Sequence, residues 1–110
     1  MAGVLVYTGS PDPQWPVNEE LCERFQEIWE RLPEWEGDHP GIPSTGYRGC
    51  FLHNRRKRWI AFGEHVVLNI GEYAMAKMDP NRECERMLLE SVPSTLPPEW
   101  EFLRSKQNRS

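Results

Sequence analysis

The sequence lacks any long apolar segment. Its first apolar run, residues 4–7, is short and follows no basic stretch, so we expect neither a membrane anchor nor a secretory leader. Cysteine is also scarce, because the chain has only three, an odd number with no C-x-x-C spacing. This pattern argues against a disulfide framework and against a zinc site. It predicts free, buried thiols in a cytoplasmic protein.

Signatures of common enzyme chemistry are absent as well. The chain contains no G-x-S-x-G, H-E-x-x-H or G-x-G-x-x-G motif and no phosphate-binding loop of the G-x-x-x-x-G-K type. We therefore expect no cofactor and no metal ion. The sequence favours a binding or assembly role over an enzyme.

Positive charge is in the minority, with 13 Lys and Arg against 17 Asp and Glu and a net charge of -4. An acidic chain has no overall attraction for phosphates, so nucleic-acid binding is not expected. The two signs are nevertheless segregated. Residues 18–38 hold eight acidic residues against two arginines, whereas residues 47–58 hold five basic residues and no acid. The molecule should therefore be dipolar, and the basic segment could meet the acidic segment of a neighbouring copy.

A chain of 110 residues can form one compact domain, which we place at residues 1–104, with a disordered tail at 105–110. Two amphipathic helices are expected within it. Asn18 can cap the first, which ends at Pro33 and carries apolar side chains at positions 21, 25, 28, 29 and 32. Asp79, followed by proline, opens the second helix, which runs to about residue 91.

Alternating polarity and β-branched residues predict a sheet. The expected strands are residues 4–8, 47–53, 58–62 and 65–70. Residues 72–78 fit either a further strand or a turn, and the proline-rich residues 10–16 and 33–46 are expected to be loops. These elements predict an α+β fold: a single two-layer domain with an antiparallel sheet of about four strands and two helices packed on one face.

Turn chemistry predicts how the central strands pair. Glycine in the first position of the two-residue loop at 63–64 favours a type II′ turn, which pairs Phe62 with His65. If His53 likewise pairs with Arg58, the side chains separate into two faces. The face expected to pack on the helices holds Cys50, Leu52, Trp59, Ala61, Val66, Leu68 and Ile70. The opposite, aromatic face holds Tyr47, Gly49, Phe51, His53, Arg58, Ile60, Phe62, His65, Val67 and Asn69.

Two short segments carry a resemblance to known sequences. Residues 9–15, GSPDPQW, resemble the SGxPxPxW opening of a family of small uncharacterised proteins, although glycine precedes serine here. Residues 46–49, GYRG, resemble a second segment of that family. The match covers about a dozen residues, and the family has no assigned activity. The resemblance therefore implies a fold topology and no functional residue.

The aromatic face supplies the first candidate binding site. The residues expected to contact a ligand are Tyr47, Phe51, Arg58, Phe62 and His65, with Arg55 and Arg56 of the adjoining basic turn. An uncovered patch of this kind marks an interface, whereas a patch covered by loops is part of the core. We favour a small binding or assembly module with an unknown protein or small-molecule partner, which could be a second copy.

Two other functions stay open. An enzyme would need an acid–base site between residues 33–46 and the sheet, with His39, His53 or Tyr47 as the catalytic group and Asp38 beside it.

A shared metal is excluded for the two sheet histidines, because their partners on the middle strand lie four residues, or roughly 13 Å, apart. Single-stranded nucleic acid could instead bind the basic turn at 55–58, where aromatic residues adjoin it.

Overall fold

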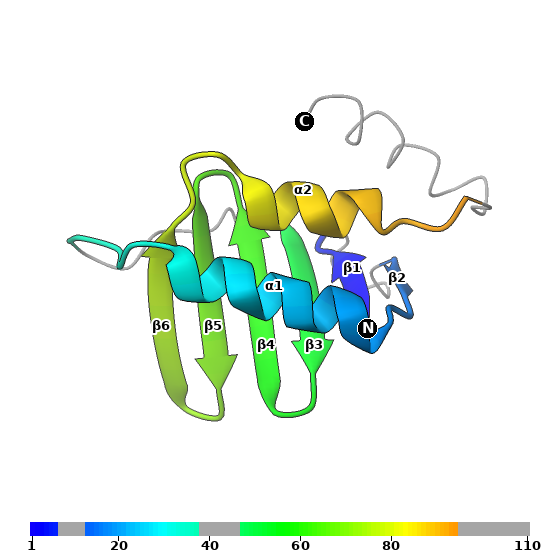
Figure 1. Cartoon of the computed structure of the whole chain (residues 1–110), viewed down its shortest axis with the longest axis horizontal. Helices are drawn as coiled ribbons and strands as arrows, with labels where there is room; N and C mark the ends of the chain where they lie inside the picture. The colour runs from blue at the N-terminus through cyan, green and yellow to red at the C-terminus, as the bar shows by residue number, and fades with distance from the viewer. Residues whose placement is uncertain (7–12, 38–46, 95–110) are drawn as a thin grey trace.

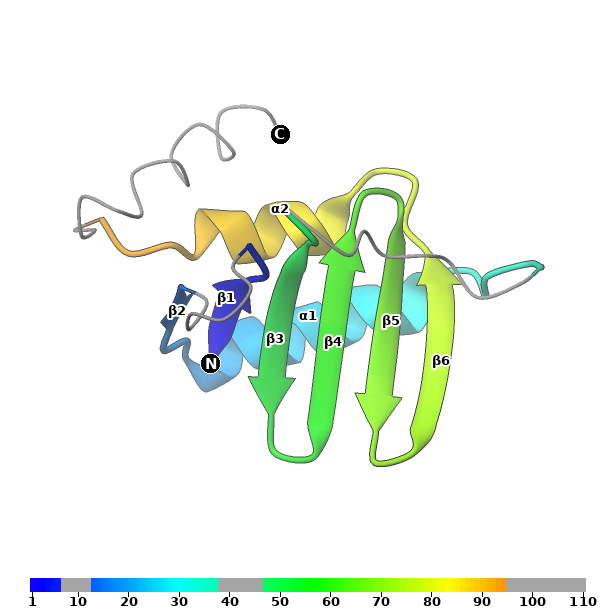
Figure 2. The same ribbon diagram turned by 180° about the vertical axis from the view of Figure 1, so that it is seen from behind.

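Two helices cover one face of a single antiparallel sheet (Figure 1), and the opposite face is seen when the molecule is turned (Figure 2). This computed structural model describes residues 1–6, 13–37 and 47–94, so the expected tail at 105–110 lies outside the described residues. The elements are β1 (Ala2–Val4), β2 (Gln14–Trp15), α1 (Glu19–Arg31), β3 (Cys50–Asn54), β4 (Lys57–Phe62), β5 (His65–Ile70), β6 (Tyr73–Met78) and α2 (Glu83–Glu90).

The strands lie in the order β2-β1-β3-β4-β5-β6, and every neighbouring pair is antiparallel. The predicted α+β class is confirmed, although the sheet has six strands instead of about four. The predicted register is confirmed too, because Phe62 lies opposite His65 and His53 lies opposite Arg58. Residues 72–78, which fitted a strand or a turn, contribute β6.

The N-terminal strands differ from the prediction. The strand expected at residues 4–8 lies at Ala2–Val4, because these residues pair with β3, and residues 7 and 8 lie outside the described part of the chain. The proline-rich segment contributes the two-residue strand β2 at the edge of the sheet. Its Trp15 is buried and donates its indole N–H to the hydroxyl of Ser91, at 2.8 Å. The edge position explains how a proline-flanked segment can join a sheet.

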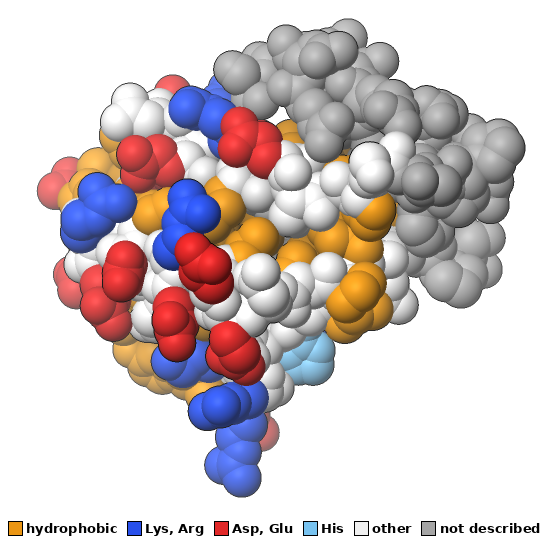
Figure 3. Space-filling view, turned by 45° about the vertical axis from the view of Figure 1, so that its right-hand side comes forward, with side chains coloured by type: hydrophobic (Ala, Val, Ile, Leu, Met, Phe, Trp, Pro, Cys, Tyr) orange, Lys and Arg blue, Asp and Glu red, His pale blue; other side chains and the backbone are white. Residues whose placement is uncertain are grey.

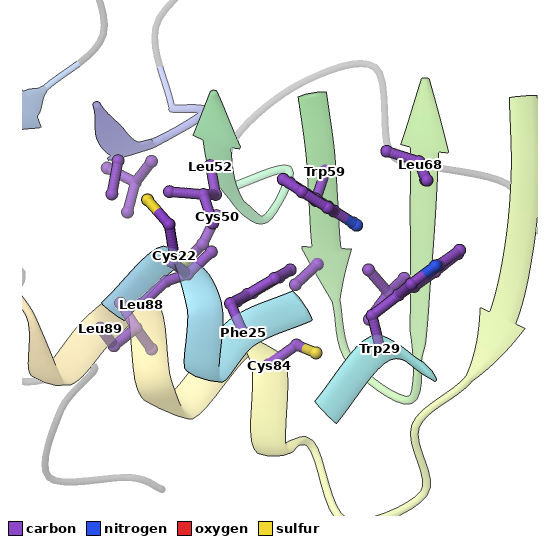
Figure 4. Packing of buried hydrophobic residues seen from close by; sticks show 14 of the residues in the cluster. Cys22, Phe25, Trp29, Cys50, Leu52, Trp59, Leu68, Cys84, Leu88 and Leu89 are labelled. Atoms are coloured by element: carbon purple, nitrogen blue, oxygen red, sulfur yellow. The ribbon is translucent and has the colours of Figure 1, made fainter. Parts of the chain in front are cut away.

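Helix α1 forms as the sequence predicts. The Asn18 side chain accepts a hydrogen bond from the Leu21 N–H at 2.9 Å, which satisfies one of the unpaired donors of the first turn. The inner face of α1 buries Cys22, Phe25 and Trp29 against the sheet, as Figure 4 shows. All three cysteines are buried, as predicted.

Helix α2 begins at Glu83, so the predicted start at Asp79 is wrong. Arg82 has a left-handed backbone with φ 55°, which separates the turn after Asp79 from the helix. The Asp79 carboxylate is buried and still accepts the first helical N–H groups, from Glu83 at 3.1 Å and from Cys84 at 2.9 Å. Asp79 therefore caps α2 from four residues before the helix begins.

Strand β3 begins at Cys50 instead of residue 47, because Gly49 interrupts the extended chain. Gly49 has φ +109°, and a Cβ at this position would lie 2.6 Å from the Ala61 carbonyl oxygen. The predicted alternation of faces therefore fails before Cys50. Tyr47, assigned to the aromatic face from that alternation, instead packs against the core between the layers.

The chain that follows α1 covers part of the outer edge of β6. Glu34 forms a β-bridge to Lys77, and the Trp35 N–H donates to the Ala76 carbonyl oxygen at 3.1 Å. The predicted loop at 33–46 thus begins with residues that pair with the sheet. Residues 38–46 lie outside the described part of the chain.

Candidate functional site

Strands β3 to β6 extend past α1 at one end of the sheet (Figure 1). A row of four paired residues crosses the strands there, in the order Asn54, Lys57, Ile70 and Tyr73. By the alternation of the strands, this row lies on the same face as the core residues Leu52, Trp59 and Leu68. Tyr73 is 58% exposed and Ile70 is 36% exposed, because α1 does not reach them. The sheet therefore presents uncovered apolar side chains beside the helix.

A groove of about 810 Å³ lies between α1 and this end of the sheet. Its helical side is acidic, and its other side is the turn between β3 and β4, Arg55-Arg56, with Lys57. The acidic side consists of Glu19, Glu23, Glu27 and Glu30. Figure 3 shows acidic side chains gathered beside the projecting basic ones at the lower end of the view. We call the groove, with Ile70 and Tyr73, the overhang face.

One side chain connects the two sides of the groove. Lys57 donates from Nζ to Oε1 of Gln26 at 3.2 Å, and Gln26 in turn donates from Nε2 to Oε1 of Glu30 at 3.2 Å. Lys57 is therefore engaged within the molecule. Arg55 and Arg56 are exposed, and within the described part of the chain neither has a hydrogen bond or an ion pair. These two guanidinium groups are available to a partner.

The aromatic face is mostly buried. Phe51 and His65 are each 8% exposed and Phe62 is half-buried, so these predicted contact residues do not form an open patch. Arg58 is exposed and lies over the Phe51 ring, with its guanidinium carbon 5.1 Å from the ring centroid. Trp35, from the chain after α1, also packs on this face with its ring 5.5 Å from that of His65.

The buried His65 ring is unusual because its Nε2 atom has no hydrogen-bond partner. The rings of Trp35 and Phe62 lie edge-on to it, at 5.5 and 6.0 Å. Burial disfavours the charged imidazolium and lowers the pKa of His65 below its ordinary value of 6.5. The unfolded chain therefore binds more protons at this residue than the folded chain does.

This difference predicts that acidification destabilises the fold through His65. The free energy of unfolding should fall as the pH drops through 6.5, because the unfolded chain gains the proton first. Urea unfolding between about pH 7.5 and about pH 5.5 measures the slope, which His65→Gln should reduce. An equal slope in wild type and His65→Gln would contradict this account.

Tyr47 is held in a buried polar cluster. Its hydroxyl donates to a carboxylate oxygen of Glu85 on α2 at 2.9 Å and lies 3.3 Å from the Cys50 sulfur. The Gly63 N–H donates to the same carboxylate oxygen at 3.3 Å. Burial, followed by the neighbouring Cys50 and Glu85, raises the pKa of Tyr47 far above its ordinary value. The phenol is therefore held protonated and donates its hydrogen bond to Glu85.

The acid–base residues proposed from sequence are not brought together among the described residues. The Tyr47 hydroxyl lies 3.3 Å from the sulfur of Cys50 at the start of β3, whereas His53 is exposed three residues further along that strand, on the opposite face and roughly 10 Å away at extended spacing. His39 and Asp38 lie outside the described residues. Within residues 1–6, 13–37 and 47–94, no three His, Cys, Asp or Glu side chains are grouped as metal ligands.

In the part of the chain that the structure describes, neither helix is long and apolar enough to cross a membrane. A comparison with protein-family models, curated proteins and solved structures finds no match to this chain. The case for a function therefore depends on the surface itself. On the described surface, the overhang face combines a groove, two exposed apolar residues and charges of both signs.

Proposed function

We propose that the protein is an assembly module that binds a second copy of itself through the overhang face. The observation that carries the proposal is the position of Ile70, which is exposed in the groove between an acidic helix and a basic turn, with the exposed Tyr73 beside it on β6. An apolar centre bordered by charged groups is the usual composition of a protein interface. The charged sides then favour one orientation of the partner over others.

Charge complementarity identifies the partner as a second copy. Two copies related by a two-fold axis present the same surface to each other, so residues of one patch meet residues of the other. On the overhang face, this operation brings the basic turn of each copy against the acidic side of α1 in the other. Because both signs lie side by side on one chain, the surface is complementary to itself. The net charge of -4 adds a general repulsion, so the affinity should be moderate. Because the attraction comes from opposite charges at the surface, the contact should weaken as the salt concentration rises.

Single-stranded nucleic acid fits the same surface less well. A phosphate chain drawn to Arg55 and Arg56 would pass close to the carboxylates of α1, which line the other side of the groove. Their repulsion offsets the attraction of the turn, since charges of both signs line the groove. The aromatic residues proposed to stack bases are also largely buried.

A charge-exchange experiment tests the proposal. The turn variant, Arg55→Glu with Arg56→Glu, and the helix variant, Glu23→Lys with Glu27→Lys, should each be monomeric, because two like charges then meet at both contacts. An equimolar mixture should associate, because each basic side again meets an acidic one. Sedimentation velocity of the full chain at about 20 mM and about 500 mM salt gives the masses, and the association of wild type should weaken at the higher salt.

The control variant, Arg24→Glu with Arg82→Glu, changes the net charge as much as the turn variant but leaves the overhang face intact. Its association should resemble that of wild type. A monomeric wild type at all concentrations would refute the proposal. So would salt-sensitive binding of a single-stranded oligonucleotide that is lost in the turn variant, which would assign the face to nucleic acid instead.

A further inference from the structure

Three tight turns in the described part of the sheet have a positive φ at the same position. Each hairpin from β3 to β6 is closed by two residues, and the first of the two has a positive φ. In the β4–β5 and β5–β6 turns this residue is glycine, Gly63 with φ 60° and Gly71 with φ 59°. In the β3–β4 turn it is Arg55, with φ 59°. One hairpin therefore places a long charged side chain where its two neighbours have none.

This geometry strains Arg55. A side chain with a Cβ is disfavoured at positive φ, and glycine is the residue that adopts it without cost. The fold offers nothing in return, because Arg55 is exposed and has no hydrogen bond or ion pair within the described part of the chain. Residues with backbone strain of this kind cluster at binding sites and switch regions.

Arg82, which also has a left-handed backbone with φ 55°, provides the contrast. There the conformation has a structural reason, since it joins the turn after Asp79 to the first residue of α2. A glycine would serve equally well at that position. At Arg55 the turn would also form with glycine, as the neighbouring hairpins show, so a role in folding does not explain the arginine.

We infer that Arg55 is the specificity-determining contact of the overhang face, with its guanidinium bound by carboxylates on α1 of a second copy. This inference rests on the assembly function proposed above. Glu23 and Glu27, one helical turn apart on the acidic side of the groove, present the carboxylates that a planar guanidinium can bind through two parallel hydrogen bonds.

The variant Arg55→Gly distinguishes a role of Arg55 in folding from a role in binding a second copy. Stability should rise in this variant, whereas self-association should weaken. Loss of strain, partly offset by the greater freedom of glycine in the unfolded chain, should raise Tm by about 3 °C. Loss of the guanidinium should raise the dissociation constant of self-association at least about tenfold, as for an interface residue that carries much of the binding energy.

Two further variants separate the effect of the Arg55 guanidinium on association from the effects of backbone strain and of charge. Arg82→Gly removes one positive charge and one left-handed side chain, as Arg55→Gly does, and should raise Tm without changing association. Arg55→Lys keeps the charge and the strain but not the paired hydrogen bonds, so it should lose part of the affinity at an unchanged Tm. Calorimetry gives the Tm values, and sedimentation equilibrium gives the dissociation constants.

The possible results distinguish a failure of the inferred Arg55 contact from a failure of the assembly function. If wild type associates and Arg55→Gly associates equally well, Arg55 is not the specificity contact, while the assembly function stands. If Arg55→Lys binds as tightly as wild type, charge alone suffices and the inferred paired contact is wrong. If Arg55→Gly lowers Tm, the arginine has a structural role and the inference fails. A monomeric wild type removes both the assembly function and this inference.

Discussion

Replacing Phe25 with alanine is expected to lower the free energy of unfolding by about 3 to 5 kcal/mol. Phe25 is fully buried in the middle of α1, and its ring packs edge-on against Trp59 of β4, with centroids 5.3 Å apart. Truncation would remove this contact and leave a cavity between the helix and the sheet (Figure 4). A domain of this size has a total stability of only about 5 to 15 kcal/mol, so the variant should be close to unfolding.

Chemical denaturation with urea measures this loss, and a milder variant shows that it comes from the cavity. Phe25→Leu keeps most of the volume and the apolar character, so it should cost clearly less than the alanine change. Ile28→Ala, at a half-buried position on the same helix, should also cost less. A loss below about 1 kcal/mol for Phe25→Ala would mean that α1 does not pack on the sheet as described.

Gly49→Ala should be similarly destabilising, by about 3 kcal/mol or more, although it adds only one methyl group. Two costs add at this position. The backbone has φ +109°, which a residue with a Cβ rarely adopts, and the new methyl group would lie 2.6 Å from the Ala61 carbonyl oxygen. That oxygen belongs to β4, which is held on both sides by neighbouring strands, so it cannot move away easily. Thermal unfolding should show a large drop in Tm.

Gly71→Ala is the control for the backbone contribution. Gly71 also has a positive φ, of +59°, but nothing lies within 4 Å of where its Cβ would be. This change should therefore cost only the conformational strain, about 1 to 2 kcal/mol. Equal losses for the two alanine variants would show that the close approach to Ala61 has no effect on stability.

Local chemistry explains which parts of the fold could be predicted from the sequence. The register of β4 and β5 follows from one glycine at the first position of a two-residue turn, and α1 follows from its cap and its apolar spacing. Both signals act over a few neighbouring residues. The start of α2 could not be predicted in this way, because Asp79 bonds N–H groups four and five residues later through a turn that passes Arg82.

The candidate site depended on information that local patterns do not contain. The acidic helix and the basic turn could both be predicted from the sequence, but only as the two poles of a dipolar molecule. A contact between them was expected between two copies of the chain, not within one. Their position beside one groove depends on where α1 crosses the sheet, which is set by the packing of Phe25 and Trp29. The same crossing leaves Ile70 uncovered, although alternation placed it on the inner face.

The edges of the sheet have a consequence for the behaviour of the protein at high concentration. An open edge strand offers unpaired backbone groups on which strands of other molecules can add and begin aggregation. Here residues 33–35 bond to one end of β6, where the Met78 N–H donates to Pro33 at 2.8 Å, and the opposite edge is the two-residue strand β2 beside prolines. The short β2 and the bonded end of β6 therefore offer little backbone for strands of other molecules to add to, so crowded copies should meet at these places through side chains.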